Sequence, residues 1–382
     1  MSNWVCTWGV PTTYPAEQAG NVIYERTVRY SFFNNLKGNK IRFGFSNEYG
    51  RHDAVISACS LAESSGKIGG VIGETFKEVT FSQNGNVIKA GKQLVSDEIE
   101  YEMEPGKYYV ISIYFKGMTY VETGNYKLAG EREINLSYCD GNHVFDELLP
   151  ENTAKETPNY LFISGADVYT DDDSYAVIAF GDSITALQWP DILAKKIYEN
   201  GITGVSVVRR AMGGNRILRD YGDYIARRRQ GSAAIKRIEH DLIQSPGAKK
   251  LVLLEGINDL CHPNAKNSFC PLEYLPTPDE LFEGYKKCFD VCRKYGLEIY
   301  QGTILPTVML TSFEEDRASI RFAVNDRIRK CEYTDGYIEF SENMKDENDV
   351  NKLKEEYDRG DHLHPNRVGE AYMADLVYEK LF

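Results

Sequence analysis

The sequence predicts an α/β fold: a three-layer α/β/α domain of flavodoxin-like type with a central parallel sheet, preceded by a jelly-roll-like β-sandwich. Three observations support this. The chain has 382 residues, which is more than one hydrophobic core usually supports. The first ~170 residues alternate apolar and polar side chains with period two. From Tyr175 onward, short apolar runs alternate with helical stretches. We therefore expect two domains, 1–172 and 173–382.

The first domain carries strand patterns and turn signals. Ile41, Phe43 and Phe45 alternate with polar or small residues, and the run 109–115 has the same alternation. Each of these strands is therefore expected to present one apolar face. Asn84-Gly85 lies between two extended stretches, where a tight turn that needs positive φ favours this pair. Antiparallel strands joined by such turns predict a β-sandwich.

The second domain is expected to begin after an acidic run at 170–174, because three consecutive Asp residues resist burial and suit an exposed joint. Helical spacing follows: Trp189, Leu193 and Ile197 fall at i, i+4 and i+8, and a last helix is predicted over 368–381. Short apolar runs between helices are typical of a parallel sheet covered on both faces. The predicted strands are 176–180, 205–208, 251–255, 297–305 and 337–340.

The first of these strands ends in the motif GDSIT, in which Ser183 directly precedes a helix. Ligands of open α/β sheets bind at the carboxyl edge of the strands, so the Ser183 hydroxyl would lie where chemistry takes place. The backbone N–H groups of a strand-to-helix turn can also stabilise a developing negative charge. By itself the motif is equally consistent with a serine that only caps the helix.

Two further motifs follow the next two strands. GGNR contains Gly213 and Gly214, and GIND contains Asn258. A glycine lets a backbone N–H approach a substrate oxygen closely, and an Asn amide adds a second neutral donor. Together they could form an oxyanion hole, although either motif alone is also typical of a plain turn.

The motif DHLHPN, directly before the last helix, supplies Asp361 and His364. A serine nucleophile needs a neutral imidazole to accept its proton and a carboxylate to orient that imidazole. Asp361 and His364 are three residues apart, so one turn of the chain could present both. Their occurrence after the three earlier motifs, in this order and at strand ends, favours a catalytic constellation over surface residues.

These four blocks resemble those of the SGNH hydrolases, the GDSL-type esterases and lipases, over ~175–382. The resemblance implies that Ser183 is the nucleophile and that Asp361 and His364 complete its triad. It implies an oxyanion hole formed by the N–H groups of Ser183 and Gly214 and by the Asn258 amide, with Gly213 as the alternative to Gly214. The two-domain layout is also similar to that of carbohydrate O-acetylesterases.

The resemblance implies a serine esterase that acts through an acyl-enzyme on a small-molecule ester, with an acetyl ester of a carbohydrate, such as an acetylated oligosaccharide, as the leading substrate. Two alternatives remain open. One is a lipase-like carboxylesterase or thioesterase for longer acyl chains, and the other is a non-catalytic glycan-binding protein. No metal or organic cofactor is expected.

Several neighbouring residues are expected to have structural roles. Asp182 and Asp259 should brace their loops through backbone N–H groups, and Trp189 should pack the first helix against the sheet. His362 is expected to face solvent. Arg216 could meet a substrate or form a surface ion pair.

Composition limits the remaining classes. The formal net charge of -13 argues against nucleic-acid or anionic-membrane partners, because both reward clustered Lys and Arg. No stretch approaches the roughly 20 apolar residues of a membrane span. The N-terminal MSNWVCTWGVPTTYP lacks a basic region followed by an apolar core, so a cytoplasmic location is expected. The eight cysteines are expected to be unpaired structural thiols.

Overall fold

A computed structural model describes residues 3–15, 22–126, 136–150, 155–156, 159–170, 173–221, 225–266, 268 and 270–382. The chain forms two compact units. The first comprises Met1–Ala176, Tyr198–Val208 and Gln244–Gly247, and the second comprises Val177–Ile197, Arg209–Ile243 and Ala248–Phe382. The predicted boundary at 172/173 adjoins residues 171–172, which lie outside the described residues, and it stays a prediction.

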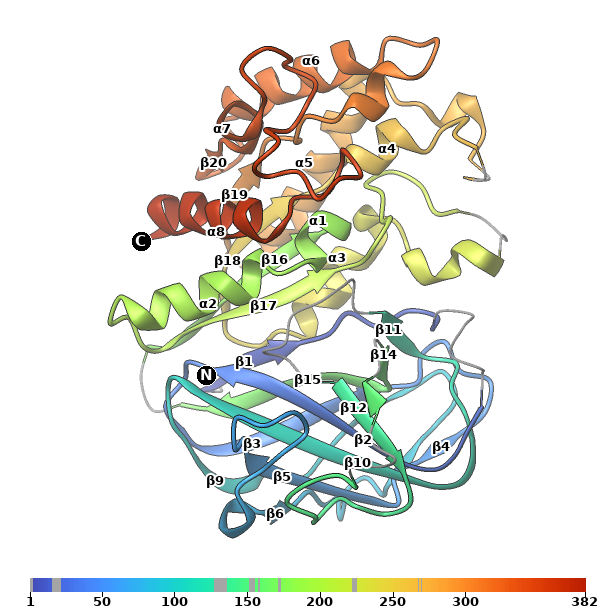
Figure 1. The fold of residues 1–382 in the computed structure, drawn as a ribbon, viewed down its shortest axis with the longest axis vertical. Coiled ribbons are helices and arrows are strands. Elements are labelled where there is room, and N and C mark those ends of the chain that lie inside the picture. The colour runs from blue at the N-terminus through green and yellow to red at the C-terminus, as the bar shows by residue number, and fades with distance from the viewer. Residues whose placement is uncertain are drawn as a thin grey trace. The chain divides into compact units, whose positions relative to one another are not determined.

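The first unit contains two antiparallel sheets, drawn in blue to green in Figure 1. One has the order β1-β15-β3-β8, with β9 also paired to β3, and the other has the order β13-β12-β2-β10-β5-β6. Trp8 of β1 stacks on Phe32 of β2 at 5.3 Å, and Phe43 of β3 lies 6.2 Å from the same ring. These contacts join the two sheets, so the predicted β-sandwich is confirmed. The strands are β1 (Trp4–Gly9), β2 (Val22–Asn34), β3 (Gly38–Ser46), β5 (Ala58–Glu63), β6 (Lys77–Glu78), β8 (Gln93–Val95), β9 (Ile99–Met103), β10 (Lys107–Tyr120), β12 (Leu136–Asp140), β13 (Lys155–Glu156) and β15 (Ile163–Tyr169), with the short pairs β4 (Ala54–Val55)-β7 (Val87–Ile88) and β11 (Gly124–Tyr126)-β14 (Asn159–Leu161) beside them.

The expected single apolar face is correct for β3 but wrong for β10. Ile41, Phe43 and Phe45 are fully buried. In β10 both faces are buried, because Val110 on the second face packs with Ala62 and Val71. Val71 belongs to a connection outside the sheet, and the local alternation of β10 could not reveal this covering segment.

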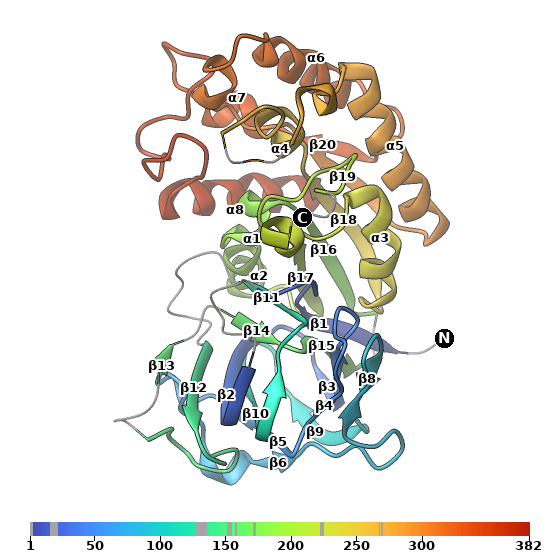
Figure 2. The same cartoon turned by 90° about the vertical axis from the view of Figure 1, so that its right-hand side faces the viewer.

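The second unit contains a five-stranded sheet of order β17-β16-β18-β19-β20. This is the flavodoxin-like order, in which the second strand lies outside the first. The predicted parallel α/β fold is confirmed. Figure 2 shows α2 and α8 on one face of the sheet and α3 and α5 on the other. The elements are β16 (Tyr175–Gly181), α1 (Ser183–Ala186), α2 (Trp189–Glu199), β17 (Val205–Ala211), α3 (Ala234–Ile243), β18 (Ala248–Leu254), α4 (Ile257–Cys261), α5 (Pro278–Lys294), β19 (Glu298–Gly302), α6 (Arg317–Arg329), β20 (Gly336–Ile338), α7 (Phe340–Met344) and α8 (Arg367–Leu381).

Two predicted strands end at least two residues earlier than expected. The apolar run 337–340 ends as a strand at Ile338, because the Glu339 side chain accepts the Glu342 N–H and starts α7. The run 297–305 ends as a strand at Gly302. Beyond it, the Asn325 amide bonds both the N–H and the carbonyl of Ile304, at 2.8 and 2.9 Å, so a side chain replaces the strand neighbour.

The state of the cysteines and the character of the helices were also predicted from the sequence. All eight cysteines are unpaired, and all except Cys331 are buried, as predicted. Among the described residues, no helix has the length and apolar character needed to cross a membrane.

Candidate active site

Ser183 lies at the turn between β16 and α1. The Asp182 side chain caps α1 by accepting the Ile184 N–H at 2.9 Å, which is the bracing role predicted for it. Gly181 ends the strand, and a Cβ there would lie 2.3 Å from the Leu254 carbonyl oxygen. Only glycine therefore lets β16 turn beside β18 at this point and place the serine at the carboxyl edge of the sheet.

The loop before α8 brings Asp361 and His364 to this serine. His364 Nε2 lies 2.7 Å from Ser183 Oγ, and His364 Nδ1 lies 2.7 Å from Asp361 Oδ2. The serine and the histidine are 181 residues apart in the chain. In this arrangement the imidazole can accept the serine proton on one nitrogen while the carboxylate holds the other.

Asp361 is poised to remain ionised. Partial burial opposes its charge, but hydrogen bonds from the His364 N–H and ring and from the Leu363 N–H outweigh burial and lower the pKa of Asp361. The two N–H groups donate to Oδ1 at 2.8 and 3.0 Å. A charged carboxylate stabilises the imidazolium that forms when a serine gives up its proton.

The same loop is anchored from outside. The Thr307 hydroxyl donates to the His362 carbonyl at 2.6 Å. His362 has a φ of +60°, an uncommon conformation for a bulky residue, and its ring binds Asp358 Oδ2 at 2.6 Å. With its side chain 54% exposed, His362 faces solvent as predicted. Asn366 caps α8 through the Val368 and Gly369 N–H groups, so both ends of the loop are fixed.

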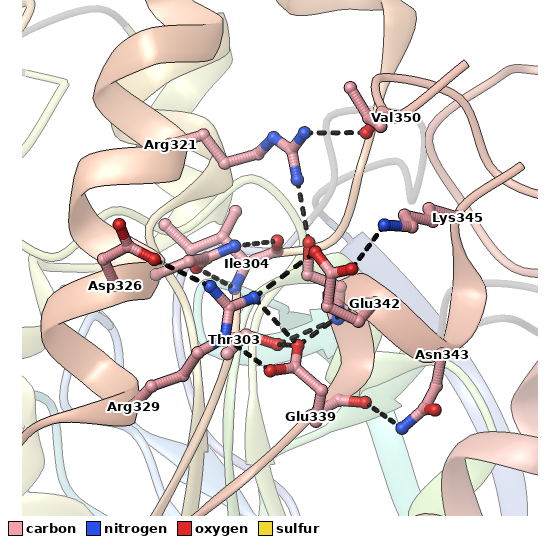
Figure 3. A network of polar contacts seen from close by, with 12 residues as sticks. Thr303, Ile304, Arg321, Asp326, Arg329, Glu339, Glu342, Asn343, Lys345 and Val350 are labelled. Carbon is pink, nitrogen blue, oxygen red and sulfur yellow. Dashed lines mark hydrogen bonds and ion pairs between the residues drawn. The ribbon is translucent and has the colours of Figure 1, made fainter. Parts of the chain in front are cut away.

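A polar network supports the chain that leads to Thr307 (Figure 3). Glu339 accepts two bonds from Arg329, at 2.6 and 3.3 Å, and one from the Thr303 hydroxyl at 2.8 Å. The Thr303 hydroxyl in turn accepts the Ser341 N–H at 2.8 Å. These bonds join the end of β19 to α6 and α7, and they fix the start of the connection that carries Thr307.

The predicted oxyanion-hole residues follow three neighbouring strands, β17, β16 and β18. Gly214 has a φ of +77°, which favours glycine. Within the described part of the chain, no group accepts a hydrogen bond from the N–H of Ser183 or Gly214. Asn258 is buried, and its Nδ2 donates one bond, at 2.9 Å, to the Asn215 carbonyl. Its second Nδ2 hydrogen remains for another acceptor. Gly213 precedes Gly214 in the same loop.

Asp259 has the structural role predicted for it, whereas Arg216 does not form the surface ion pair that was considered for it. Asp259 accepts the N–H groups of Ile217 and Leu218 at 2.8 and 3.1 Å, which is the predicted bracing role, and burial raises the pKa of Asp259 to about 6. Arg216 is buried rather than part of a surface ion pair. It donates to the Arg219 carbonyl and to Cys270 Sγ and lies 4.1 Å over the Tyr221 ring. Its stacking and its backbone acceptor explain why it is found inside.

The segment after the nucleophile is closely packed. Trp189 is fully buried, and Ala186, Leu187 and Gln188 before it are buried as well. Trp189 therefore packs in the core, as predicted.

Arg237, a buried residue of α3, was not predicted as part of the site. Its Nε donates to Asn215 Oδ1 at 2.8 Å, its Nη1 to the Arg210 carbonyl at 3.0 Å, and its Nη2 to the Gly181 carbonyl at 3.0 Å. One guanidinium thus holds the segments that carry Ser183 and Gly214. Because it binds the Asn215 side chain, it also positions Asn215, whose carbonyl accepts the Asn258 amide.

Buried carboxyl groups surround this guanidinium. Burial works against ionisation of Asp241, but the Arg237 charge, the His240 hydrogen bond and the charges of Arg210 and His240 together outweigh it and lower the pKa of Asp241. Burial raises the pKa of Glu255 well above its usual range, although Arg237 opposes the shift. Burial and the neighbouring Asp259 raise the pKa of Asp182 to about 7. Asp241 therefore carries the charge that pairs with Arg237, whereas burial favours the protonated form of Glu255.

Among the described residues, no three His, Cys, Asp or Glu side chains converge in a way that could hold a metal ion.

Comparison with known proteins places this site in a family. The sequence model of the GDSL-like Lipase/Acylhydrolase family matches residues 179–372, which is more than half of the chain. No curated protein matches the sequence.

Among solved structures, an acetyl xylan esterase, AlAXEase, is 19% identical with a TM-score of 0.40, over 54% of this chain and 100% of that one. A GDSL-like lipase from Bacteroides thetaiotaomicron is 16% identical with a TM-score of 0.38, over 54% and 86%. The esterase EstA from Pseudoalteromonas sp. is 13% identical with a TM-score of 0.39, over 54% and 96%. Likenesses this low have no bearing on the substrate.

Proposed function

The chain belongs to the GDSL-like lipase/acylhydrolase family and is therefore an ester hydrolase, and we propose that it is a serine esterase that removes short acyl groups, acetyl above all, from carbohydrates. The observation that supports the serine mechanism is the hydrogen-bonded series Ser183, His364 and Asp361, with both connecting distances at 2.7 Å. A nucleophile, a base and a group that orients the base are the parts that acyl transfer requires.

In the proposed mechanism, His364 Nε2 takes the Ser183 proton as Oγ attacks the ester carbonyl. The carbonyl oxygen becomes an oxyanion held by the N–H groups of Ser183 and Gly214 and by the Asn258 amide. His364 then gives its proton to the departing alcohol and leaves an acyl-serine. A water molecule, deprotonated by His364, attacks this acyl group and releases the acid.

The packing after the nucleophile supports a short acyl group. Residues 186–189, which in a lipase-like enzyme would line a wide apolar groove, are buried against the protein itself. This favours acetyl or propionyl over longer chains.

Exposed aromatic side chains of the first unit support a carbohydrate as the alcohol. Four tyrosines of the first unit, Tyr30, Tyr109, Tyr114 and Tyr160, are buried in its core. Tyr24 and Tyr120 are 65% and 37% exposed, and the register of β2 with β10 places them on one face of the sheet, together with Val22 and Met118. Tyr120 already stacks on His52, with ring centroids 4.3 Å apart, and an exposed aromatic face such as that of Tyr24 can stack on a sugar ring.

The proposal is tested by acetate release from acetylated xylo- and manno-oligosaccharides, alongside p-nitrophenyl esters of increasing chain length. We expect release from the sugars, and activity on the model esters that falls beyond propionyl. Ser183→Ala should lose at least about a thousandfold in kcat, as removal of a serine nucleophile does elsewhere. A preference for longer acyl chains would instead identify a general carboxylesterase, and activity that survives Ser183→Ala would refute the mechanism.

A further inference from the structure

The side chain of Gln230 lies against Gly214, whose N–H is proposed to hold the oxyanion. A Cβ at position 214 would lie 2.4 Å from Gln230 Nε2, so the Gln230 amide occupies the space that a side chain at 214 would fill. A Cβ is about 2.5 Å from the backbone nitrogen of its own residue, which places Gln230 Nε2 within about 5 Å of the Gly214 nitrogen. An amide at this distance can reach a substrate atom next to the oxyanion.

The Gln230 side chain is largely buried, and among the described residues no hydrogen bond satisfies its amide. Gln230 is 5% exposed, and its Oε1 is enclosed without a partner. Within the described part of the chain, neither end of this amide is hydrogen-bonded. A largely buried amide without partners is disfavoured in a folded protein. Nε2, unlike Oε1, is not enclosed, so a molecule bound beside Gly214 can reach it.

The backbone of Gln230 is fixed to the loop that carries Gly214. The Asn215 side chain donates from Nδ2 to the carbonyls of Gln230 and Ser232, at 2.7 and 2.8 Å. The Asn215 carbonyl accepts the Asn258 amide at 2.9 Å. The unpaired amide is therefore held relative to both Gly214 and Asn258, as a group that binds substrate must be.

We infer that Gln230 is a specificity residue that binds a free hydroxyl group of the alcohol portion of the substrate, next to the ester being cleaved. A carboxamide offers one acceptor and two donors, and a hydroxyl group both donates and accepts. A sugar hydroxyl beside the acyl group can therefore accept a hydrogen bond from Gln230 Nε2, whereas an ester without a neighbouring hydroxyl cannot. This inference rests on the proposed function and deepens it, because it names the substrate feature that the site recognises.

The competing explanation is that Gln230 only packs over Gly214 and keeps the oxyanion loop in place. In that case its loss would slow the cleavage of every ester alike, because all of them use the same oxyanion hole. Binding of a hydroxyl group predicts an effect that depends on the substrate. The two explanations therefore separate when several esters are compared.

The experiment compares wild type with Gln230→Met, which keeps the length of the side chain and removes its hydrogen bonds. Three esters are used: a monoacetylated methyl xyloside, its analogue that lacks the hydroxyls next to the ester, and p-nitrophenyl acetate. Gln83→Met, at an exposed glutamine of the first unit, is the matched control. Thermal unfolding of each variant checks that the fold is retained.

We expect Gln230→Met to lower kcat/KM for the hydroxylated sugar about 10- to 100-fold, the range expected for a lost hydrogen bond to a substrate hydroxyl. The deoxy analogue and p-nitrophenyl acetate should change less than about threefold. Wild type itself should prefer the hydroxylated sugar over the deoxy analogue by a similar factor, a comparison that needs no variant.

An equal loss on all three esters, or no loss on any, would overturn the inference while leaving the proposed function intact. If wild type cleaves p-nitrophenyl esters but neither sugar, the proposed carbohydrate function fails, and the role of Gln230 fails with it.

Discussion

Replacement of Arg237 by lysine tests whether one buried guanidinium positions the catalytic groups. Lysine keeps the positive charge beside Asp241 but presents its donors from a single nitrogen. That nitrogen cannot also bond Asn215 Oδ1 and the carbonyls of Arg210 and Gly181, which lie around the plane of the guanidinium. At least two of these three bonds should be lost.

Bonds to a charged donor contribute roughly 1.5–3 kcal/mol each, so the loss of two should lower the free energy of unfolding by about 3 kcal/mol or more. The acyl-transfer step should slow as well, because the segments that carry Ser183 and Gly214 are no longer held. A small displacement of oxyanion donors lowers kcat by about 10- to 100-fold, and KM should stay within about twofold.

Urea unfolding and steady-state cleavage of p-nitrophenyl acetate measure the two effects. Arg327→Lys, at an arginine of α6 that pairs with Asp279, is the control and should change neither. A double variant with Asn258→Ala tests the route through Asn215, because residues that act through one network give non-additive effects. If Arg237→Lys is destabilised but keeps its kcat, Arg237 is not a positioning residue. If the two substitutions are additive in kcat, the route to Asn258 is wrong.

Three further predictions concern the supports of the site. The folded-state pKa of Asp182, about 7 against 3.8 for an ordinary aspartate, means that the folded protein holds a proton that the unfolded chain has released. The free energy of unfolding should therefore fall as pH rises from about 4 to 7, and Asp182→Asn should flatten this fall in urea titrations across that range. Thr307→Val removes the hydroxyl that holds the His362 carbonyl, and should lower the free energy of unfolding by about 1 kcal/mol and kcat severalfold. An unchanged kcat would show that the loop holds without this bond. Arg329→Met breaks the network with Glu339 and should lower the unfolding midpoint while kcat stays within twofold, because this network fixes only the start of the connection and the Thr307 hydroxyl still holds the His362 carbonyl.

The part of the site that the sequence could predict is the part written in contiguous motifs. GDSIT and DHLHPN each place a chemical group directly at an element boundary, and the structure brings Ser183, Asp361 and His364 together in the expected order. The parallel sheet could be predicted because short apolar runs alternate along the chain with stretches of helical periodicity. Both inferences depend on local patterns, which a sequence displays directly.

The features that escaped prediction depend on contacts between distant segments. Arg237 is followed by Asp241 at i+4, a spacing typical of a solvent-exposed helix pair, and only the folded chain shows that both are buried. The Gln230 amide has no motif around it. The second buried face of β10 is covered by a segment around Val71, and the alternation of apolar and polar residues within the strand does not indicate this covering segment.

The separation of 181 positions in the chain between Ser183 and His364 makes esterase activity a late event in folding. The two side chains meet only after β16 and the loop before α8 have both reached the same sheet edge, and contacts of such long range form slowly. A partly folded chain therefore displays a serine that no base activates and cannot attack esters prematurely. Recovery of activity after dilution from denaturant should accordingly lag behind recovery of secondary structure, and it provides a simple measure of how much of the chain has reached the native state.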